Sequence, residues 1–510
     1  MAAVALTAPP PRTPVRRRAI PHPERSPMEE LVNRCLMAGL PGTSVPAPME
    51  ELISAGLGGV ILFGRNLENA EQVRALTGAA RAVRGDLLVG VDEEGVEPGH
   101  FVALGGPPRA GNHALGALDD VDLTRRVGAD IGAYLSALGI NVDFAPCADV
   151  NTLPENPVIG VRSFGADPAL VARHTDAFTA GVQAAGVAAC AKHFPGHGGT
   201  RVDSHVDLPE AELTETDLTP FLACAPDRAA MVLAAHVRYR GLGDEPASLN
   251  RRILTGLLRE ELGFRGVAAT DALEMGAVSG RMAVGDAAVR ALAAGADLLL
   301  LGSAEVDVWK VRDAVLAAVA DGRLPGARVE EAAGRVRELA ERFAAPAVPA
   351  PAGAGAGGPD AEAGERLAAR LAPEPLGAAP YVVEMRGPDL GFPERFAGLP
   401  EIAASLDPAA GGVVLSGAPP GGADRLLEEV ARAGGGRRPL VVGVQDAHRA
   451  PWMRGLLAEL LERRPDAVVI GTGLADDAAV ASGAAAFLPS YGRSPALLRP
   501  LLAALLGRSG

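Results

Sequence analysis

The stretch VAACAKHFPGHG, residues 187–198, is a short apolar run that ends abruptly in charged residues, proline and glycine. Seven other runs follow the same rule, and an amphipathic stretch with helical spacing comes after each run. Short apolar runs that alternate with helices predict a parallel sheet. Eight such units favour a closed (β/α)8 TIM-type barrel, an α/β fold, with a doubly wound open sheet as the alternative. The other seven runs span residues 35–42, 58–66, 86–95, 140–151, 230–240, 266–275 and 296–303.

Polar side chains stand where these runs end. In a barrel the carboxyl ends of the strands form the face that carries the chemistry, and in an open sheet they form the binding crevice. We therefore expect the side chains at these positions to converge in either fold. They are Asp92, Asp149, Lys192, His193, His236 and Asp271.

Residues 344–365 are rich in proline, alanine and glycine and lack an apolar period, which predicts a linker. The linker separates a catalytic TIM-barrel domain, residues 27–343, from a smaller αβα sandwich domain, residues 366–510. Residues 1–26 predict a disordered leader. In the second domain His448 is expected to make local contacts only, and no catalytic residue is expected there.

Composition narrows the class of protein. The 510 residues carry a net charge of −14 with 48% hydrophobic residues, which indicates a globular chain. The acidic balance argues against nucleic acid or an anionic membrane as a partner, and no uncharged run is long enough for a membrane helix. The four cysteines lack CxxC spacing and predict buried free thiols. The first segment lacks the order of a secretory signal, so we expect a cytoplasmic protein.

Residues 192–209, KHFPGHGGTRVDSHVDLP, hold three of the nine histidines, and Lys192 is one of only two lysines among 48 Lys and Arg residues. Chance, a metal site and an acid–base site compete to explain this stretch. His193 and His197 have the i, i+4 spacing of helical metal ligands. However, a proline and a glycine between them would break the helix, and the glutamate of HExxH is missing. The pattern favours an acid–base site, without a metal or cofactor.

The acid–base interpretation rests on two carboxylates and one imidazole. Asp203 would orient the ring of His205 on a glycine-flanked loop and favour its protonated form. Asp271 follows an apolar strand directly, so its carboxylate would point into the barrel mouth. Asp271 as nucleophile and His205 as acid/base would form a two-residue glycosidase site, a variant of the usual carboxylate pair.

Three motifs resemble glycoside hydrolase family 3, in particular its NagZ-like bacterial β-N-acetylglucosaminidases in their two-domain form. They are NPVIGVRSFG (156–165), KHFPGHGGTRVDSH (192–205) and GFRGVAATDALEMGAV (263–278), and the resemblance runs from residue 28 to residue 340. It implies a retaining exo-glycosidase that removes terminal β-linked N-acetylglucosamine. The implied partner is a small carbohydrate, such as a muropeptide in cell-wall recycling or a chitin oligosaccharide.

The same resemblance implies a role for each matching residue. Asp271 looks like the catalytic nucleophile, and Asp203 and His205 look like the dyad in which histidine is the general acid/base. His236 is similar to a structural histidine below the site. The implied sugar ligands are Asp92, Arg162, Lys192 and His193.

One segment departs from the family pattern, D-x-EGG-x-V-x-R. This chain reads DEEGVEPGHF (92–101), where Val96 replaces a glycine, His100 replaces an arginine and Pro98 alters the backbone. The departure bears on sugar recognition more than on catalysis, and it motivates a non-catalytic sugar-binding protein as an alternative. A β-N-acetylglucosaminide or β-glucoside phosphorylase is another alternative, because a neutral histidine does not repel phosphate. A metal hydrolase is the last.

Overall fold

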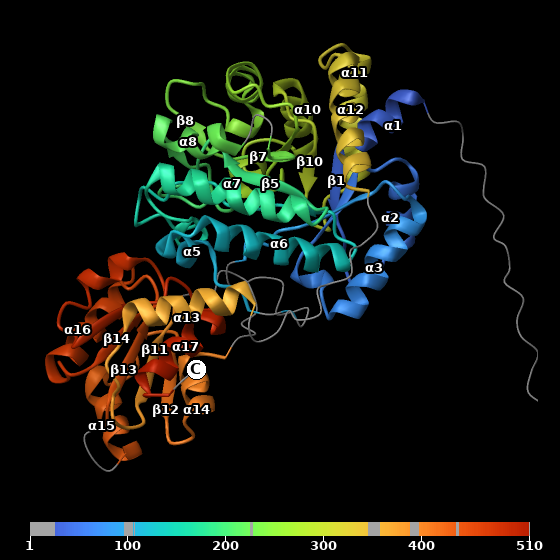
Figure 1. Ribbon diagram of the computed structural model, residues 1–510. Coiled ribbons are helices and arrows are strands. Elements are labelled where there is room, and N and C mark those ends of the chain that lie inside the picture. Colours follow the sequence, from blue (N-terminus) through green and yellow to red (C-terminus); the bar gives the residue numbers. More distant parts are fainter. Residues whose placement is uncertain are drawn as a thin grey trace, which may run out of the picture.

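The computed structural model describes residues 26–95, 106, 108–224, 228–344, 358–387, 397–434 and 438–508. It contains two α/β regions, with helix α13 (Pro359–Leu371) lying between them (Figure 1). Of the predicted leader, only Ser26 lies within the described residues, where it caps the first helix. Among the described residues, no helix is both long and apolar enough to cross a membrane.

The first region is a barrel of eight parallel strands in the order β10-β1-β2-β3-β4-β5-β7-β9, which confirms the barrel over the open sheet. The two end strands meet through a parallel bridge between Ala269 and Leu298, and Thr270 N donates to the Leu298 carbonyl. Each strand lies within one of the eight apolar runs. The strands are β1 (Leu36–Gly39), β2 (Gly59–Leu62), β3 (Leu88–Val91), β4 (Val142–Asp143), β5 (Ala188–Phe194), β7 (Met231–Ala234), β9 (Val267–Thr270) and β10 (Leu299–Leu301).

Helices surround the barrel and turn an apolar face toward the strands. Asp120, Asp167 and Asp307 cap helices by accepting hydrogen bonds from backbone N–H groups of the first turn. The α-helices are α1 (Pro27–Arg34), α2 (Ala47–Ser54), α3 (Ala70–Val83), α5 (Asn112–Leu118), α6 (Val121–Ala137), α7 (Pro168–Ala184), α8 (Glu215–Cys224), α9 (Gly276–Ser279), α10 (Val284–Ala294), α11 (Val308–Ala320) and α12 (Gly326–Arg342). The connections include a small β6–β8 pair (Glu210–Ala211, Arg238–Tyr239) and the short helices η1 (Gly64–Asn66), η2 (Gly160–Arg162), η3 (Ala247–Leu249) and η4 (Arg252–Glu261).

The barrel interior is filled by side chains, as is usual for this architecture. Met37, Phe144 and Met231 are fully buried in it, together with Phe343, which follows α12. The Phe343 carbonyl accepts a hydrogen bond from Asn141, which precedes β4, so α12 closes the amino-terminal end of the barrel. The opposite, carboxyl-terminal end of the barrel carries the polar residues that follow the strands. The four cysteines are buried and free, as predicted.

The second region is an αβα sandwich, as predicted. Its parallel sheet has the order β12-β11-β13-β14-β15. The first strand, β11, therefore lies inside the sheet, with β12 on one side of it and β13 to β15 on the other, as in doubly wound folds. Separate apolar clusters cover the two faces. The elements are β11 (Tyr381–Met385), α14 (Leu399–Leu406), β12 (Gly411–Leu415), α15 (Gly422–Gly434), β13 (Leu440–Val444), α16 (Pro451–Arg463), β14 (Val468–Gly471), η5 (Ala475–Ala479), β15 (Ala486–Pro489) and α17 (Pro495–Leu505).

Helix α13 begins inside the segment predicted to be a linker, residues 344–365. The buried carboxylate of Asp360, in its first turn, accepts hydrogen bonds from Arg109 Nη1 and Ala110 N of the barrel, each at 2.8 Å. Residues 359–365 therefore belong to a helix that contacts the barrel and not to a linker. The contact forms because Asp360, in this low-complexity stretch, pairs with the buried Arg109. Residues 345–357 lie outside the described residues.

Candidate active site

The residues singled out from the sequence lie on the carboxyl-terminal face of the barrel, where strands far apart in the sequence bring their ends together. Hydrogen bonds and charge interactions connect them into one site, in two groups described below. They are Asp92 after β3, Arg162 in η2 after β4, Lys192 and His193 at the end of β5, Asp203 and His205 in the loop after β5, and Asp271 directly after β9.

The first group is a cluster of charges at the ends of β3, β4 and β5. Lys192 Nζ lies 2.6 Å from both Asp92 Oδ1 and Glu94 Oε1. Arg162 donates two hydrogen bonds to the Glu94 carboxylate, at 2.7 and 2.9 Å. Burial raises the pKa of Glu94, but Arg162 and Lys192 outweigh it and hold that pKa well below its usual range. Burial lowers the pKa of Lys192, and Asp92 and Glu94 raise it on balance. Glu94 and Lys192 are therefore charged at neutral pH.

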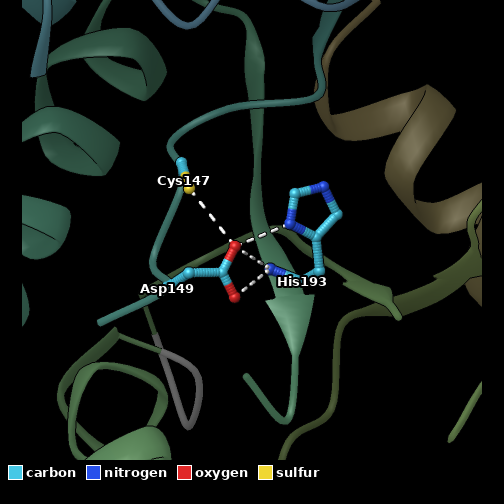
Figure 2. Close-up of side chains that lie close together, drawn as sticks. All are labelled: Cys147, Asp149 and His193. Atoms are coloured by element: carbon cyan, nitrogen blue, oxygen red, sulfur yellow. Dashed lines mark hydrogen bonds and ion pairs between the residues drawn. The ribbon is translucent and has the colours of Figure 1, made fainter. Parts of the chain in front are cut away.

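Asp149 orients the imidazole of His193 (Figure 2). Its carboxylate accepts from His193 Nδ1 at 2.7 Å and from His193 N at 3.2 Å. It also accepts from His197 N at 2.6 Å. With the Nδ1 proton directed at Asp149, His193 Nε2 is left as an acceptor, and it lies 3.5 Å from Arg162 Nη2. Burial raises the pKa of Asp149, but the two histidines lower it to about 2 overall. The result is a fixed ring at the mouth of the barrel.

Cys147, Asp149 and His193 are close enough together to hold a metal ion, so their chemistry bears on the expectation that no metal is bound. The Asp149 carboxylate already accepts the three N–H donors, and Cys147 Sγ lies 3.3 Å from its Oδ2 (Figure 2). Burial raises the pKa of Cys147 well above its usual value, so its sulfur is a neutral thiol and a poor ligand. A metal would have to displace these hydrogen bonds. The donor set therefore fits the orientation of His193 better than a metal centre.

The second group begins with Asp203 and His205, which form a hydrogen-bonded pair. Asp203 Oδ1 accepts from His205 Nδ1 at 2.8 Å and from the His205 backbone N–H at 2.9 Å. The hydrogen bond to Asp203 is the main cause that raises the pKa of His205, and the charge of Asp271 adds to it. The His205 side chain is 63% exposed. An accessible imidazole whose protonated form is favoured is suited to proton transfer.

The loop that carries this pair is attached to the segment that follows Asp271. Gly276 N donates to the His205 carbonyl at 3.1 Å, and Ala277 N donates to the Ser204 carbonyl at 3.2 Å. A glycine is required at position 276, because a Cβ there would lie 2.4 Å from the Val206 carbonyl oxygen. The contact brings the Asp203–His205 pair to the end of β9.

Asp271 lies at that end, and its Oδ1 accepts from Ala272 N at 2.8 Å. Burial raises the pKa of Asp271, but the nearby imidazoles of His236, His193 and His205 lower it overall, so the side chain is ionised at neutral pH. His236 supports this segment from below, with Nε2 donating to the Ala272 carbonyl at 2.9 Å and Nδ1 lying 2.6 Å from Ser248 Oγ. A carboxylate in this position has the chemistry of a nucleophile.

Sequence reasoning missed the partners that organise these residues. Glu94, two positions from Asp92 in the DEEG stretch, is not among the predicted site residues. Asp149 is predicted to lie at the site, but the sequence indicates no role for it. Asn156 opens the NPVIGVRSFG motif, and its buried amide proves to connect two loops of the site. The altered part of the loop after β3, with Val96, Pro98 and His100, lies outside the described residues.

Comparisons with known proteins bear on the identity of this site. Residues 43–339 match the glycosyl hydrolase family 3 N terminal domain. A beta-hexosaminidase of Pseudomonas aeruginosa (strain LESB58) is 39% identical over 282 residues, which cover 52% of this chain and 81% of that protein. Beta-hexosaminidase A of Pseudoalteromonas piscicida is 37% identical over 290 residues, or 51% of this chain, and the match spans about half (48%) of that relative.

Solved structures extend the likeness to the second region. The glycoside hydrolase family 3 beta-N-acetylglucosaminidase from Paenibacillus sp. str. FPU-7 is 30% identical with a TM-score of 0.84, covering 95% of this chain and 98% of its own. Beta-N-acetylhexosaminidase from Beutenbergia cavernae is 30% identical with a TM-score of 0.59, covering 62% of this chain and 99% of its own. The family domain matches more than half of the chain, and the resemblance of the three motifs is confirmed: the chain belongs to glycosyl hydrolase family 3.

Proposed function

We propose that this chain is a retaining exo-glycosidase that hydrolyses terminal β-linked N-acetylglucosamine. The observation that carries the proposal is the pair of backbone hydrogen bonds between the Asp203–His205 loop and the segment after Asp271. These bonds hold the Asp203–His205 loop at the end of the strand that Asp271 follows, which supports a joint role for the imidazole and the carboxylate. Relatives named beta-hexosaminidase and beta-N-acetylglucosaminidase support the choice of sugar.

In the first step, the Asp271 carboxylate attacks the anomeric carbon while His205 donates a proton to the glycosidic oxygen. The bond from the anomeric carbon to that oxygen breaks, the alcohol leaves, and the sugar becomes an ester of Asp271. The raised pKa of His205 and the lowered pKa of Asp271 favour the protonation states that this step needs.

In the second step, the now neutral His205 removes a proton from water as the water oxygen attacks the anomeric carbon. The ester bond to Asp271 breaks, and two inversions give net retention. Asp203 remains ionised throughout, because His205 lowers its pKa by more than burial raises it. Its charge stabilises the imidazolium each time His205 holds the extra proton.

We assign binding of the sugar hydroxyls to the charge cluster. Lys192 and Arg162 offer N–H donors in fixed positions, since their carboxylate partners hold them at 2.6–2.9 Å. Asp92, whose side chain is 37% exposed, is the acceptor available to the sugar. His193 completes the set with the Nε2 that Asp149 leaves as an acceptor.

Terminal N-acetylglucosamine on muropeptides or chitin oligosaccharides is the substrate class we propose, with the reaction in the cytoplasm. Four buried free thiols are typical of that compartment. Phosphate is the second candidate acceptor, because the acid/base is a histidine. Once His205 has given up its proton, it does not repel a phosphate dianion as a carboxylate would.

The test is incubation with an aryl β-N-acetylglucosaminide and the matching β-glucoside, each with and without phosphate. We expect release of the aryl group from the N-acetylglucosaminide without phosphate, with free N-acetylglucosamine as product. A sugar phosphate as main product would establish a phosphorylase. Activity on neither substrate would favour a sugar-binding protein, and loss of activity with a chelator would restore the metal hypothesis.

A further inference from the structure

Two backbone carbonyls of the loop after β4 are held by the second region. His448 Nε2 lies 3.1 Å from the Pro154 carbonyl oxygen, and the Arg449 guanidinium donates to the Asn156 carbonyl. Both side chains come from the turn 446–449, which follows β13. The expectation that His448 makes only local contacts is therefore wrong, because this residue reaches the barrel.

Hydrogen bonds and an ion pair within the second region fix the turn 446–449. The fully buried Asp477 carboxylate accepts from His448 N at 2.9 Å and from His448 Nδ1 at 2.7 Å, and Arg449 forms an ion pair with Asp446. Asp446 has a φ of 56°, in the left-handed region that side chains with a Cβ rarely adopt. Such backbone strain persists where the surroundings enforce it, and it collects at functional sites.

The side chain of Asn156 forms hydrogen bonds with two loops of the candidate active site. Its Nδ2 donates to the His197 carbonyl at 2.8 Å and to the Gly198 carbonyl at 3.1 Å, at the start of the loop that carries the dyad. Its Oδ1 accepts from the backbone N–H groups of residues 158 and 159, at 2.9 and 2.8 Å, just before η2, which carries Arg162. The side chain is fully buried, so water does not compete for these bonds.

His197 completes the path to the dyad. Its Nδ1 lies 2.7 Å from Thr200 Oγ1 and its Nε2 lies 3.1 Å from Ser204 Oγ. Burial is the main cause that lowers the pKa of His197 to about 4, so the ring is neutral, with one nitrogen as donor and the other as acceptor. Ser204 stands between Asp203 and His205 in the chain. A continuous series of contacts therefore leads from His448 and Arg449 to the proposed acid/base.

We propose that the second region is a positioning module for the reaction, in which the turn 446–449 fixes Pro154 and Asn156 and thereby fixes the Asp203–His205 loop. His448 and Arg449 are positioning residues, and neither has to touch the substrate. The inference rests on the proposed glycosidase function. Small misplacements of a catalytic group are costly in rate, which is what gives such a module an effect.

The test compares Arg449→Ala and His448→Ala with the matched control Arg370→Ala. Arg370, in α13, also donates to a barrel carbonyl, that of Ala117 in α5. For the two test variants we expect kcat on an alkyl β-N-acetylglucosaminide, which has a poor leaving group, to fall roughly tenfold to a hundredfold. The loss on an activated aryl glycoside should be smaller, because that leaving group needs little protonation. Arg370→Ala should keep the wild-type kcat on both substrates.

Two further measurements separate positioning from a general loss of stability. Arg449→Lys retains an N–H donor and should recover part of the lost kcat. Backbone amides of residues 197–206 should exchange with deuterium faster in Arg449→Ala than in Arg370→Ala, with both samples held the same number of degrees below their melting temperatures.

The outcomes distinguish this inference from the proposed function. Equal loss of kcat in all three alanine variants, equal loss on good and poor leaving groups, or unchanged exchange of residues 197–206 would overturn the positioning role. A wild-type protein that cleaves no glycoside would overturn the proposed function instead. The exchange measurement would still decide whether the turn 446–449 holds the dyad loop in place.

Discussion

The chain uses the same side-chain pair in two regions, the loop after β5 and the turn after β13. In both, one carboxylate oxygen accepts from the histidine Nδ1 and from the histidine backbone N–H. The Nδ1 distances are 2.8 Å for His205–Asp203 and 2.7 Å for His448–Asp477. The surroundings differ: the His205 side chain is 63% exposed and the His448 side chain 12%. Within the described residues His205 Nε2 makes no hydrogen bond, whereas His448 Nε2 faces the Pro154 carbonyl.

The second nitrogen of each imidazole, Nε2, decides what the Asp–His pair can do. The pKa is raised in both histidines. For His448, burial lowers the pKa, but the hydrogen bonds to Asp477 and to the Pro154 carbonyl raise it on balance. An imidazole can exchange a proton with a substrate only through a nitrogen that the substrate reaches. The exposed pair is therefore suited to proton transfer, and the buried pair is a fixed link between the two regions.

The largest effect on kcat is expected at Asp271, because the proposed reaction begins with attack by its carboxylate. Asp271→Ala removes the attacking carboxylate, so kcat should fall by about 10⁴-fold or more. The melting temperature and the affinity for N-acetylglucosamine, measured by calorimetry, should change little. A loss below tenfold would place the nucleophile on another residue.

The next effect separates the two histidines directly. His205→Ala should lower kcat by about 10² to 10⁴-fold on glycosides with poor leaving groups and far less on activated aryl glycosides. His448→Ala should follow the same order among substrates with a smaller loss, because it displaces the acid/base instead of removing it. Rates over a series of leaving groups measure both variants. If His205→Ala affects all substrates equally, the exposed pair only binds the sugar.

A smaller effect is expected on the pH profile. His205 must be protonated in the first step, so kcat/KM should fall as pH rises through the pKa of His205 in the free enzyme. Asp203 raises that pKa, so Asp203→Asn should move the alkaline limb of the profile to lower pH. Asp477→Asn, the matched change in the buried pair, should leave the limb where it is. An alkaline limb that stays in place in Asp203→Asn would contradict the assignment of His205.

The smallest effect is expected from the substitutions at Val96 and His100, which concern the binding of the sugar and not the transfer of the proton. An arginine offers a permanent charge and a planar fork of donors where this chain has His100, and Val96 adds bulk where the pattern D-x-EGG-x-V-x-R has glycine. Val96→Gly combined with His100→Arg should therefore lower KM for N-acetylglucosaminides a few-fold and leave kcat nearly unchanged, as when uniform binding is restored. Initial rates over a range of substrate concentrations give both constants. If KM is unchanged or activity is lost, the loop serves another sugar.

The barrel could be predicted because each strand is a local apolar run, and the site could be located because polar residues stand at the ends of these runs. The ion pairs between residues that are distant in the sequence could not be predicted in the same way. Glu94 binds Lys192 and Arg162 across three strands, and no spacing in the sequence encodes that meeting. Likewise, α13 extends into a low-complexity stretch because Asp360 finds Arg109, which is distant in the sequence.

The central claim is that Asp271 attacks the sugar while the exposed His205–Asp203 pair handles the proton. The most direct test is to incubate the enzyme with a slow fluorinated aryl β-N-acetylglucosaminide, digest it and map the labelled peptide by mass spectrometry. We expect one sugar per chain, attached to Asp271. An adduct on another residue, or turnover of the parent glycoside with inverted configuration at the anomeric carbon, would contradict it.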